Sequence, residues 1–411
     1  MTTNGTASAA FSRSKNLAKV EPTGLRTLRQ EVERRRAAGD DVVDLARDES
    51  THEPSRALLD LTVKPMQQAP LISADAAGTL ALRAAAARYF SLLSGGRPVN
   101  ADYLVVTSGA RHAVFSACLV LFESGDHVLV PAPSAAWFPS IVRLARATPV
   151  PVPGDVEWSL KVSVADLEQR TDARTVGLIL SSPVNPTGAV YTRSELKSIV
   201  TWARDRGLWL IVDESYRQLH FGSGPAPSVL DLQDELLERV VVVAGLGLSP
   251  GTSGWRVGVA MAPSAVAQAI ALLQEHTTGG ASVPAQEAAA VLLTDARAGP
   301  ERELAVDAVR LKRDRAVQFF REKLPGIEFV EPLGGLSLFF RVDGFFTGEI
   351  DGARAFCEQL LTDRGVALAP GDAFGDGRWI RLTYGVPDAE LETGLERLAD
   401  FAGVLTKGGT P

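Results

Sequence analysis

The sequence predicts an α/β protein with a mostly parallel central sheet, followed by a smaller α+β domain. First, short apolar strands alternate with helices of 10 to 15 residues between about residues 103 and 276 of the 411-residue chain, a pattern typical of parallel sheets. Second, polar residues and glycines follow several of these strands directly. Third, the alternation stops near residue 300 and gives way to strands followed by helices, which favours a separate α+β unit.

The N-terminal region begins with a small, polar stretch at residues 1–18, which we expect to form a loose arm. The next segment, 20–38, has the pattern of an amphipathic helix, with Pro22 near its start and Gly39 after its end. A short strand is predicted at 42–45 and an alanine-rich helix at 79–93.

The central region should place its functional groups at one edge of the sheet. The predicted strands are 103–107, 127–130, 175–180, 208–212, 240–244 and 257–261, with helices at 137–147, 193–206 and 264–276. Ligands in such sheets bind beyond the carboxyl ends of the strands. Gly109, Asn185, Asp213 and the turn at Leu248 all follow strand ends, so the pattern predicts one shared pocket.

The C-terminal region is predicted to hold a long charged helix and a small sheet. The expected helices are 301–323, 353–364 and 388–404, and the expected strands are 327–330, 334–340 and 379–382.

Composition excludes several classes of partner. The formal net charge of −7 argues against nucleic acid. No apolar run reaches the length of a membrane span or a signal peptide, so we expect no membrane association. The two cysteines, Cys118 and Cys357, build neither a disulfide framework nor a metal site. We therefore expect a cytoplasmic protein without a metal ion.

Three motifs in order carry a resemblance to a known family. They are Asn185-Pro186-Thr187-Gly188, Asp213-Glu214-Ser215-Tyr216 and Gly254-Trp255-Arg256-Val257-Gly258. Together they resemble the fold-type I, class I/II aminotransferases, which use pyridoxal 5′-phosphate (PLP). The resemblance implies a homodimer with an aminotransferase-like large domain at 51–299. It also implies a discontinuous small domain made of 19–50 and 300–411.

The resemblance also implies a cofactor site. Asp213 matches the carboxylate that pairs with the pyridinium and makes the ring an electron sink. Asn185 and Tyr216 match the groups that hydrogen-bond the ring hydroxyl. Arg256, with the backbone of Gly109 and Ala110 at a helix N-terminus, matches the phosphate cradle.

Two further residues are expected to contact the substrate or the cofactor ring. Arg381, in Arg381-Leu382-Thr383-Tyr384, matches the arginine that holds the substrate α-carboxylate. The aromatic residue that usually stacks on the ring aligns with Ala135, and Trp137 is close enough in sequence to compensate.

Several positions besides Ala135 depart from the family pattern. The lysine that forms a Schiff base with PLP aligns with Leu248, and no lysine occurs between Lys197 and Lys312. Loss of a positioned acid or base typically costs about 10²–10⁴-fold in rate. A Gly-Glu-Pro-like turn that presents a backbone amide to the substrate reads Asp48-Glu49-Ser50 here.

From these departures we expect an enzyme that lacks the catalytic lysine and is not an ordinary transaminase. It would act on a small amino-acid-like or carboxylate substrate, with Asp213 and Tyr216 as catalytic residues. It would bind PLP, pyridoxamine phosphate or a PLP adduct non-covalently, if at all. Two alternatives stay open: a PLP-independent enzyme that reuses the cleft, and a non-catalytic binding or scaffold protein of the same fold.

Overall fold

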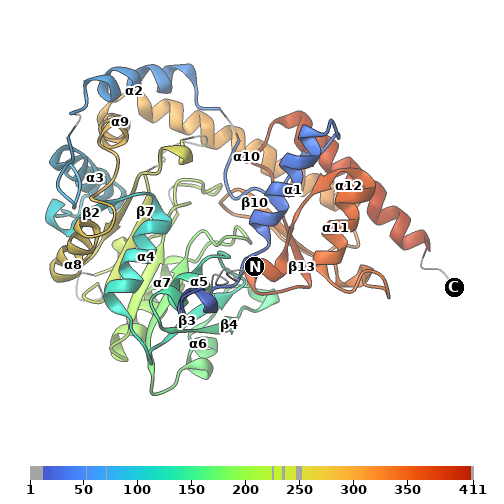
Figure 1. Cartoon of the computed structure of the whole chain (residues 1–411), viewed down its shortest axis with the longest axis horizontal. Helices are drawn as coiled ribbons and strands as arrows, with labels where there is room; N and C mark the ends of the chain where they lie inside the picture. Colours follow the sequence, from blue (N-terminus) through green and yellow to red (C-terminus); the bar gives the residue numbers. More distant parts are fainter. Residues whose placement is uncertain are drawn as a thin grey trace, which may run out of the picture.

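The computed structural model describes residues 13–51, 53–70, 72–224, 226–233, 237–246 and 252–408. The chain forms a larger part around a seven-stranded sheet and a smaller part around a four-stranded sheet, and the long helix α10 (Ala298–Lys323) runs between them (Figure 1). Residues 1–12 of the predicted N-terminal arm lie outside the described ranges.

The larger part confirms the predicted, mostly parallel sheet. Its strand order is β2-β8-β7-β6-β5-β3-β4, and β8 runs in the direction opposite to the other six strands. The strands are β2 (Leu104–Thr107), β3 (His127–Ala132), β4 (Thr148–Pro153), β5 (Thr175–Ser181), β6 (Trp209–Asp213), β7 (Val240–Gly245) and β8 (Gly258–Met261).

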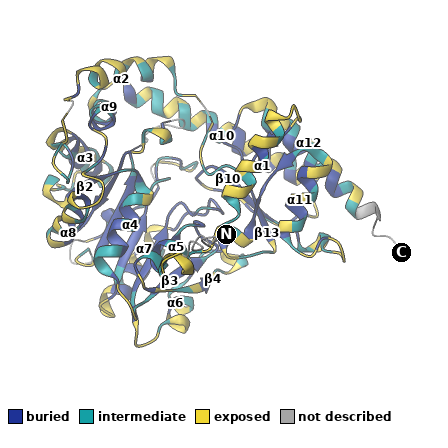
Figure 2. Cartoon of the chain, viewed as in Figure 1, coloured by how far each residue is buried: buried dark blue, intermediate teal, exposed yellow. Residues whose placement is uncertain are grey.

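Helices cover both faces of this sheet, so its strands, apart from the largely exposed edge strand β4, are buried on both sides (Figure 2). On β5, Leu178 and Leu180 enter one apolar core while Ile179, between them, enters another. This two-sided burial explains why the strands are continuous apolar runs and do not alternate. The helices are α2 (Arg56–Gln68), α3 (Leu80–Leu93), α4 (Ala110–Leu121), α5 (Phe138–Leu144), α6 (Val164–Arg170), α7 (Arg193–Asp205), α8 (Ser264–Glu275) and α9 (Val283–Thr294).

The smaller part has its own apolar core. Its antiparallel sheet has the order β12-β13-β10-β9. Its elements are β9 (Phe329–Val330), β10 (Ser337–Arg341), α11 (Ala353–Arg364), β11 (Val366–Ala367), β12 (Ala369–Pro370), β13 (Trp379–Thr383) and α12 (Asp388–Gly408). The N-terminal segment joins this part, because β1 (Val43–Asp44) pairs in parallel with β11. The exact domain boundaries stay a prediction.

Some elements differ from those predicted. Helix α1 (Leu25–Ala37) begins five residues later than expected, because Gly24 before it adopts a left-handed conformation (φ +78°). Helices α2, α6 and α9 and strands β4, β11 and β12 were not predicted. In the part of the chain that the structure describes, no helix is long and apolar enough to cross a membrane. Nor do those residues contain a group of three His, Cys, Asp or Glu side chains placed to hold a metal ion.

Candidate active site

One pocket at the carboxyl ends of the parallel strands collects most of the predicted site residues. Seven of them line it: Gly109, Ala110, Trp137, Asn185, Asp213, Tyr216 and Arg256. Arg381 lies behind the pocket wall, where it contacts two lining residues, Asp48 and Asn185. The structure therefore brings the predicted set together. Leu248 lies outside the described residues.

Asp213, the last residue of β6, is a buried carboxylate. Its Oδ1 accepts hydrogen bonds from the backbone N–H of Ser215 (3.0 Å) and from the Ser215 hydroxyl. Burial raises the pKa of Asp213 even though these bonds and Arg111 act to lower it. A carboxylate in this state would be stabilised by a cationic N–H donor in the pocket. A protonated pyridine nitrogen is such a donor, so Asp213 fits its predicted role.

The predicted phosphate cradle consists of the start of α4 and the Arg256 side chain. Gly109 precedes α4 with φ +86°, and a Cβ built there would lie 2.7 Å from a guanidinium nitrogen of Arg256. Only glycine lets the backbone and the guanidinium approach this closely. Arg256 is about half exposed, and its Nη1 lies 3.6 Å from Glu49 Oε1. Unsatisfied N–H groups of a helix N-terminus beside a cation suit an anion such as phosphate.

Tyr216 and Asn185 also line the pocket, and both contact protein atoms. The Tyr216 hydroxyl donates to the backbone carbonyl of Asp48 (2.9 Å), and burial raises the pKa of Tyr216, so the hydroxyl stays protonated. Asn185 Oδ1 accepts from Nη1 of Arg381 (3.2 Å). Their predicted bonds to a ring hydroxyl stay a prediction, because both polar groups here bind protein atoms.

Arg381, on β13, is only 1% exposed. Its Nη2 donates to the carbonyl of Ala46 (2.7 Å), and its Nη1 donates to Asp48 as well as to Asn185. The sequence showed that Asp48 departs from the family pattern but did not indicate this ion pair. Strand β13 and the segment after β1 meet only in the folded chain, so no local pattern could reveal the contact.

Trp137 lines the pocket at the start of α5, and Ala135 lies beside it. The guanidinium carbon of Arg111 lies 5.1 Å from the centre of the Trp137 ring, within the range of a cation–π contact. Arg111 was not predicted as a site residue. The sequence could have indicated Arg111, because it follows the predicted cradle residues Gly109 and Ala110 directly and so lies in the first turn of α4.

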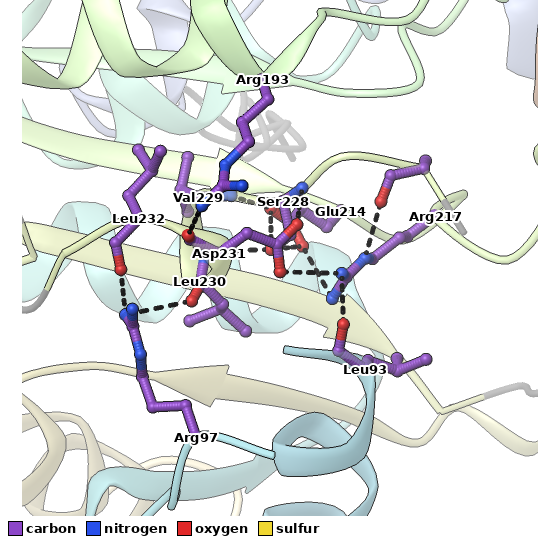
Figure 3. Close-up of polar contacts among 11 residues, drawn as sticks. Leu93, Arg97, Arg193, Glu214, Arg217, Ser228, Val229, Leu230, Asp231 and Leu232 are labelled. Atoms are coloured by element: carbon purple, nitrogen blue, oxygen red, sulfur yellow. Dashed lines mark hydrogen bonds and ion pairs between the residues drawn. The ribbon is translucent and has the colours of Figure 1, made fainter. Parts of the chain in front are cut away.

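A buried polar network behind the pocket supports the Asp213–Tyr216 segment (Figure 3). Glu214 is 3% exposed and accepts from the Ser228 hydroxyl (2.7 and 2.8 Å) and the Val229 N–H (3.1 Å). Arg217 lies 3.9 Å from Glu214 and 3.5 Å from Asp231. The network fixes the backbone on both sides of Ser215, and with it the positions of Asp213 and Tyr216. Sequence reasoning missed its role.

Comparison with known proteins identifies the fold and the family. Residues 40–398 match the family described as aminotransferase class I and II. The chain belongs to the class I and II aminotransferases. An aspartate aminotransferase of Geobacillus stearothermophilus is 30% identical to it over 94% of this chain and 98% of that protein. Another from Streptomyces avermitilis is 33% identical over 75% and 76% of the two chains.

The structure of this aminotransferase chain also resembles solved members of the family. Aspartate aminotransferase from Thermus thermophilus with maleate superimposes with a TM-score of 0.86 at 25% identity, over 95% of this chain and all of that one. The fold prediction is therefore confirmed. The family assignment makes the chain an enzyme of a family that uses PLP.

The expected function needs correction. We expected an enzyme that is not an ordinary transaminase, or else a PLP-independent enzyme or a scaffold. Relatives named aspartate aminotransferase, 30% and 33% identical over most of the chain, point instead to ordinary amino-group transfer. The expectation gave the single position 248 more weight than the pattern of the whole chain. The match of Leu248 to the family's lysine stays a prediction, because that residue lies outside the described ranges.

Proposed function

We propose that this aminotransferase moves an amino group between a small carboxylate-bearing amino acid and a 2-oxo acid. One observation carries the proposal. The buried carboxylate of Asp213, the cradle at Gly109 and Arg256, and Asn185 all line a single pocket, and Arg381 contacts Asn185 from behind its wall. These are an acceptor for a cationic nitrogen, a site for phosphate and a site for carboxylate, and PLP chemistry on an amino acid needs all three.

The residues present fit PLP as cofactor. When bound, PLP supplies the electron sink for chemistry at the substrate Cα. Asp213 would hold the pyridine nitrogen in its protonated form, and Arg256 with the N-terminus of α4 would bind the phosphate. Asn185 and Tyr216 would orient the ring through its hydroxyl, and Arg381 would hold the substrate carboxylate.

We propose that the cofactor is held by these contacts and not by a covalent bond at position 248, because the side chain of Leu248 is a hydrocarbon. Two charge-assisted contacts, at Asp213 and Arg256, would contribute about 1.5–3 kcal/mol each. Together with neutral hydrogen bonds they support dissociation constants in about the micromolar to millimolar range.

Aspartate and 2-oxoglutarate are the first substrates to test. The names of the relatives support aspartate, and the maleate in the Thermus thermophilus enzyme supports a dicarboxylate. We further propose that the protein is a homodimer in the cytoplasm, with no nucleic-acid or membrane partner. The family resemblance supports the dimer, and the composition supports the rest.

An absorbance titration with PLP between about 330 and 430 nm, followed by addition of aspartate, tests the proposal. We expect saturable binding, removal of the reduced cofactor by dialysis after borohydride treatment, and, in a separate unreduced sample, spectral conversion with release of oxaloacetate. In the Asp213→Asn variant we expect PLP to bind at least about 10-fold more weakly, because a neutral amide no longer stabilises the pyridinium. The exposed Asp205→Asn variant is the control.

Two results would contradict the proposal. Absence of PLP binding at millimolar concentration would exclude the cofactor role of the pocket. Binding without any transfer from aspartate or other amino acids would exclude transamination. A borohydride-fixed adduct would contradict only the non-covalent attachment.

A further inference from the structure

Asp48 places a carboxylate of the protein itself on the buried arginine of the site. Nη1 of Arg381 donates to Asp48 Oδ1, while Asp48 Oδ2 lies 3.8 Å from Nη2 of Arg111. Asp48 lines the pocket, and its side chain is 24% exposed. The carboxylate therefore lies between two cations at the position where Arg381 would receive a ligand.

The contact between Asp48 and Arg381 does not use the full binding capacity of the guanidinium. Arginine can hold a carboxylate through two parallel N–H bonds. Here Nη1 serves both Asp48 and Asn185, and Nη2 binds the Ala46 carbonyl. Among the described residues Nε has no hydrogen-bond partner although it is buried. A buried donor without a partner costs free energy. A carboxylate that also bonded Nε would therefore bind Arg381 more strongly than Asp48 does.

The surroundings of Asp48 provide a second place for its side chain. The Tyr216 hydroxyl donates to the Asp48 backbone carbonyl and not to the carboxylate, whose hydrogen-bond partners are Arg381 and Asn185. Arg111 is about half exposed and already lies near Oδ2. Rotation toward Arg111 would keep the Asp48 charge paired and would release Nη1 of Arg381.

We propose that Asp48 is a specificity-determining residue that competes with the substrate's carboxylate for Arg381. This rests on the proposed function, in which Arg381 binds that carboxylate. Every carboxylate ligand must first displace Asp48, so the side chain weakens their binding. It thereby lowers the preference of the pocket for a carboxylate over a neutral group at this position.

Calorimetric titration with maleate tests the competition. Maleate is a dicarboxylate without an amino group, so it binds without reacting. The full-length protein is titrated with and without saturating PLP, as wild type and as Asp48→Asn. We expect the variant to bind maleate about 10- to 100-fold more tightly, because its neutral amide competes less well for a charge-assisted contact. Glu53→Gln, an exposed acid on the same segment, makes the same charge change and should shift the dissociation constant by less than twofold.

The outcomes separate this inference from the proposed function. Equal maleate affinity in wild type and Asp48→Asn, or an equal gain in Glu53→Gln, overturns the role of Asp48 even if transamination is observed. Tighter binding in Asp48→Asn alone supports it even if PLP fails to bind. Asp48→Ser provides a second uncharged variant if the asparagine variant lacks the native circular-dichroism spectrum. If the enzyme is active, Asp48→Asn should lower KM for aspartate more than it changes kcat.

Discussion

At the scale of single residues, Glu214 shows how a buried charge can support a site that it does not enter. Both of its carboxylate oxygens accept from the Ser228 hydroxyl, and Oε1 also accepts from the Val229 N–H. Arg217 adds an opposite charge at 3.9 Å. Despite these partners, burial raises the pKa of Glu214. The ionised group is therefore held at a cost that its hydrogen bonds reduce.

We expect Ser228→Ala to destabilise the protein by about 1.5–3 kcal/mol, the usual worth of a hydrogen bond to a charged group. Ser228 is fully buried, so water cannot replace the lost hydroxyl. Urea unfolding at pH 7 measures the change. Ser194→Ala, which removes an exposed hydroxyl, should stay within about 0.5 kcal/mol of wild type. A cost of that same small size for Ser228→Ala would show that Glu214 does not need this donor.

The pH dependence of the same variant follows from the raised pKa of Glu214. Between the unfolded value, about 4.3, and the higher folded value, the folded state binds more protons than the unfolded state. Stability therefore falls as pH rises through this window. Loss of the Ser228 donor raises the folded pKa further. The fall in stability should therefore extend to higher pH in Ser228→Ala than in wild type.

At the scale of elements, the sequence predicted those whose pattern is strong and local. Strand β6, for example, is a continuous apolar run that ends at Asp213, and the ends of such strands predicted where the pocket lies. Strand β4 was missed because Pro149, Pro151 and Pro153 remove donors at alternate positions. That pattern is tolerated because β4 is one of the two edge strands of its sheet. Helix α2 was missed in part because it contains Pro65.

The junction of β2 and α4 makes a prediction about the phosphate cradle. Gly109→Ala should destabilise the protein by about 1–3 kcal/mol, because alanine is strained at φ +86°. Its Cβ would also displace the Arg256 guanidinium, so PLP should bind at least about 10-fold more weakly. Thermal unfolding and the PLP titration measure the two effects.

Gly125→Ala is the matched control for that variant. Gly125 has φ +103°, and a Cβ built there meets no atom within 4 Å. It should reproduce the loss of stability without the loss of PLP affinity. If both variants weaken PLP binding equally, the effect comes from general strain, and Arg256 is not the group that responds to Gly109.

At the scale of the whole molecule, the site depends on contacts between segments that are far apart in the chain. Arg381 from β13 meets the Ala46–Asp48 segment and Asn185. The Ser337 hydroxyl of β10 donates to the Pro186 carbonyl (2.8 Å). Motifs predicted which residues belong to the site, since each motif is local. The partners of those residues could not be predicted, because Asp48 and Arg381 are 333 residues apart.

A double-mutant cycle over Asp48 and Arg381 measures this long-range link. Arg381→Met alone should cost about 3–5 kcal/mol, since it leaves the Asp48 carboxylate without its main cation. The double variant with Asp48→Asn should cost less than the sum of the single changes, with a coupling of about 1–3 kcal/mol. Urea unfolding measures these free energies. If the losses of the two single variants add up to that of the double variant within about 0.5 kcal/mol, the ion pair does not connect the two segments.

The pairing of β1 with β11, together with the ion pair between Asp48 and Arg381, has a consequence for biosynthesis. A ribosome adds about 5–20 residues per second, so the 333 residues that separate this ion pair take about 20 to 60 seconds to translate. The seven-stranded sheet, which ends at Met261, can assemble during that interval. The start of the chain must wait for β11 and β13 to emerge, so a nascent chain stalled before them would expose an incomplete pocket to chaperones and proteases.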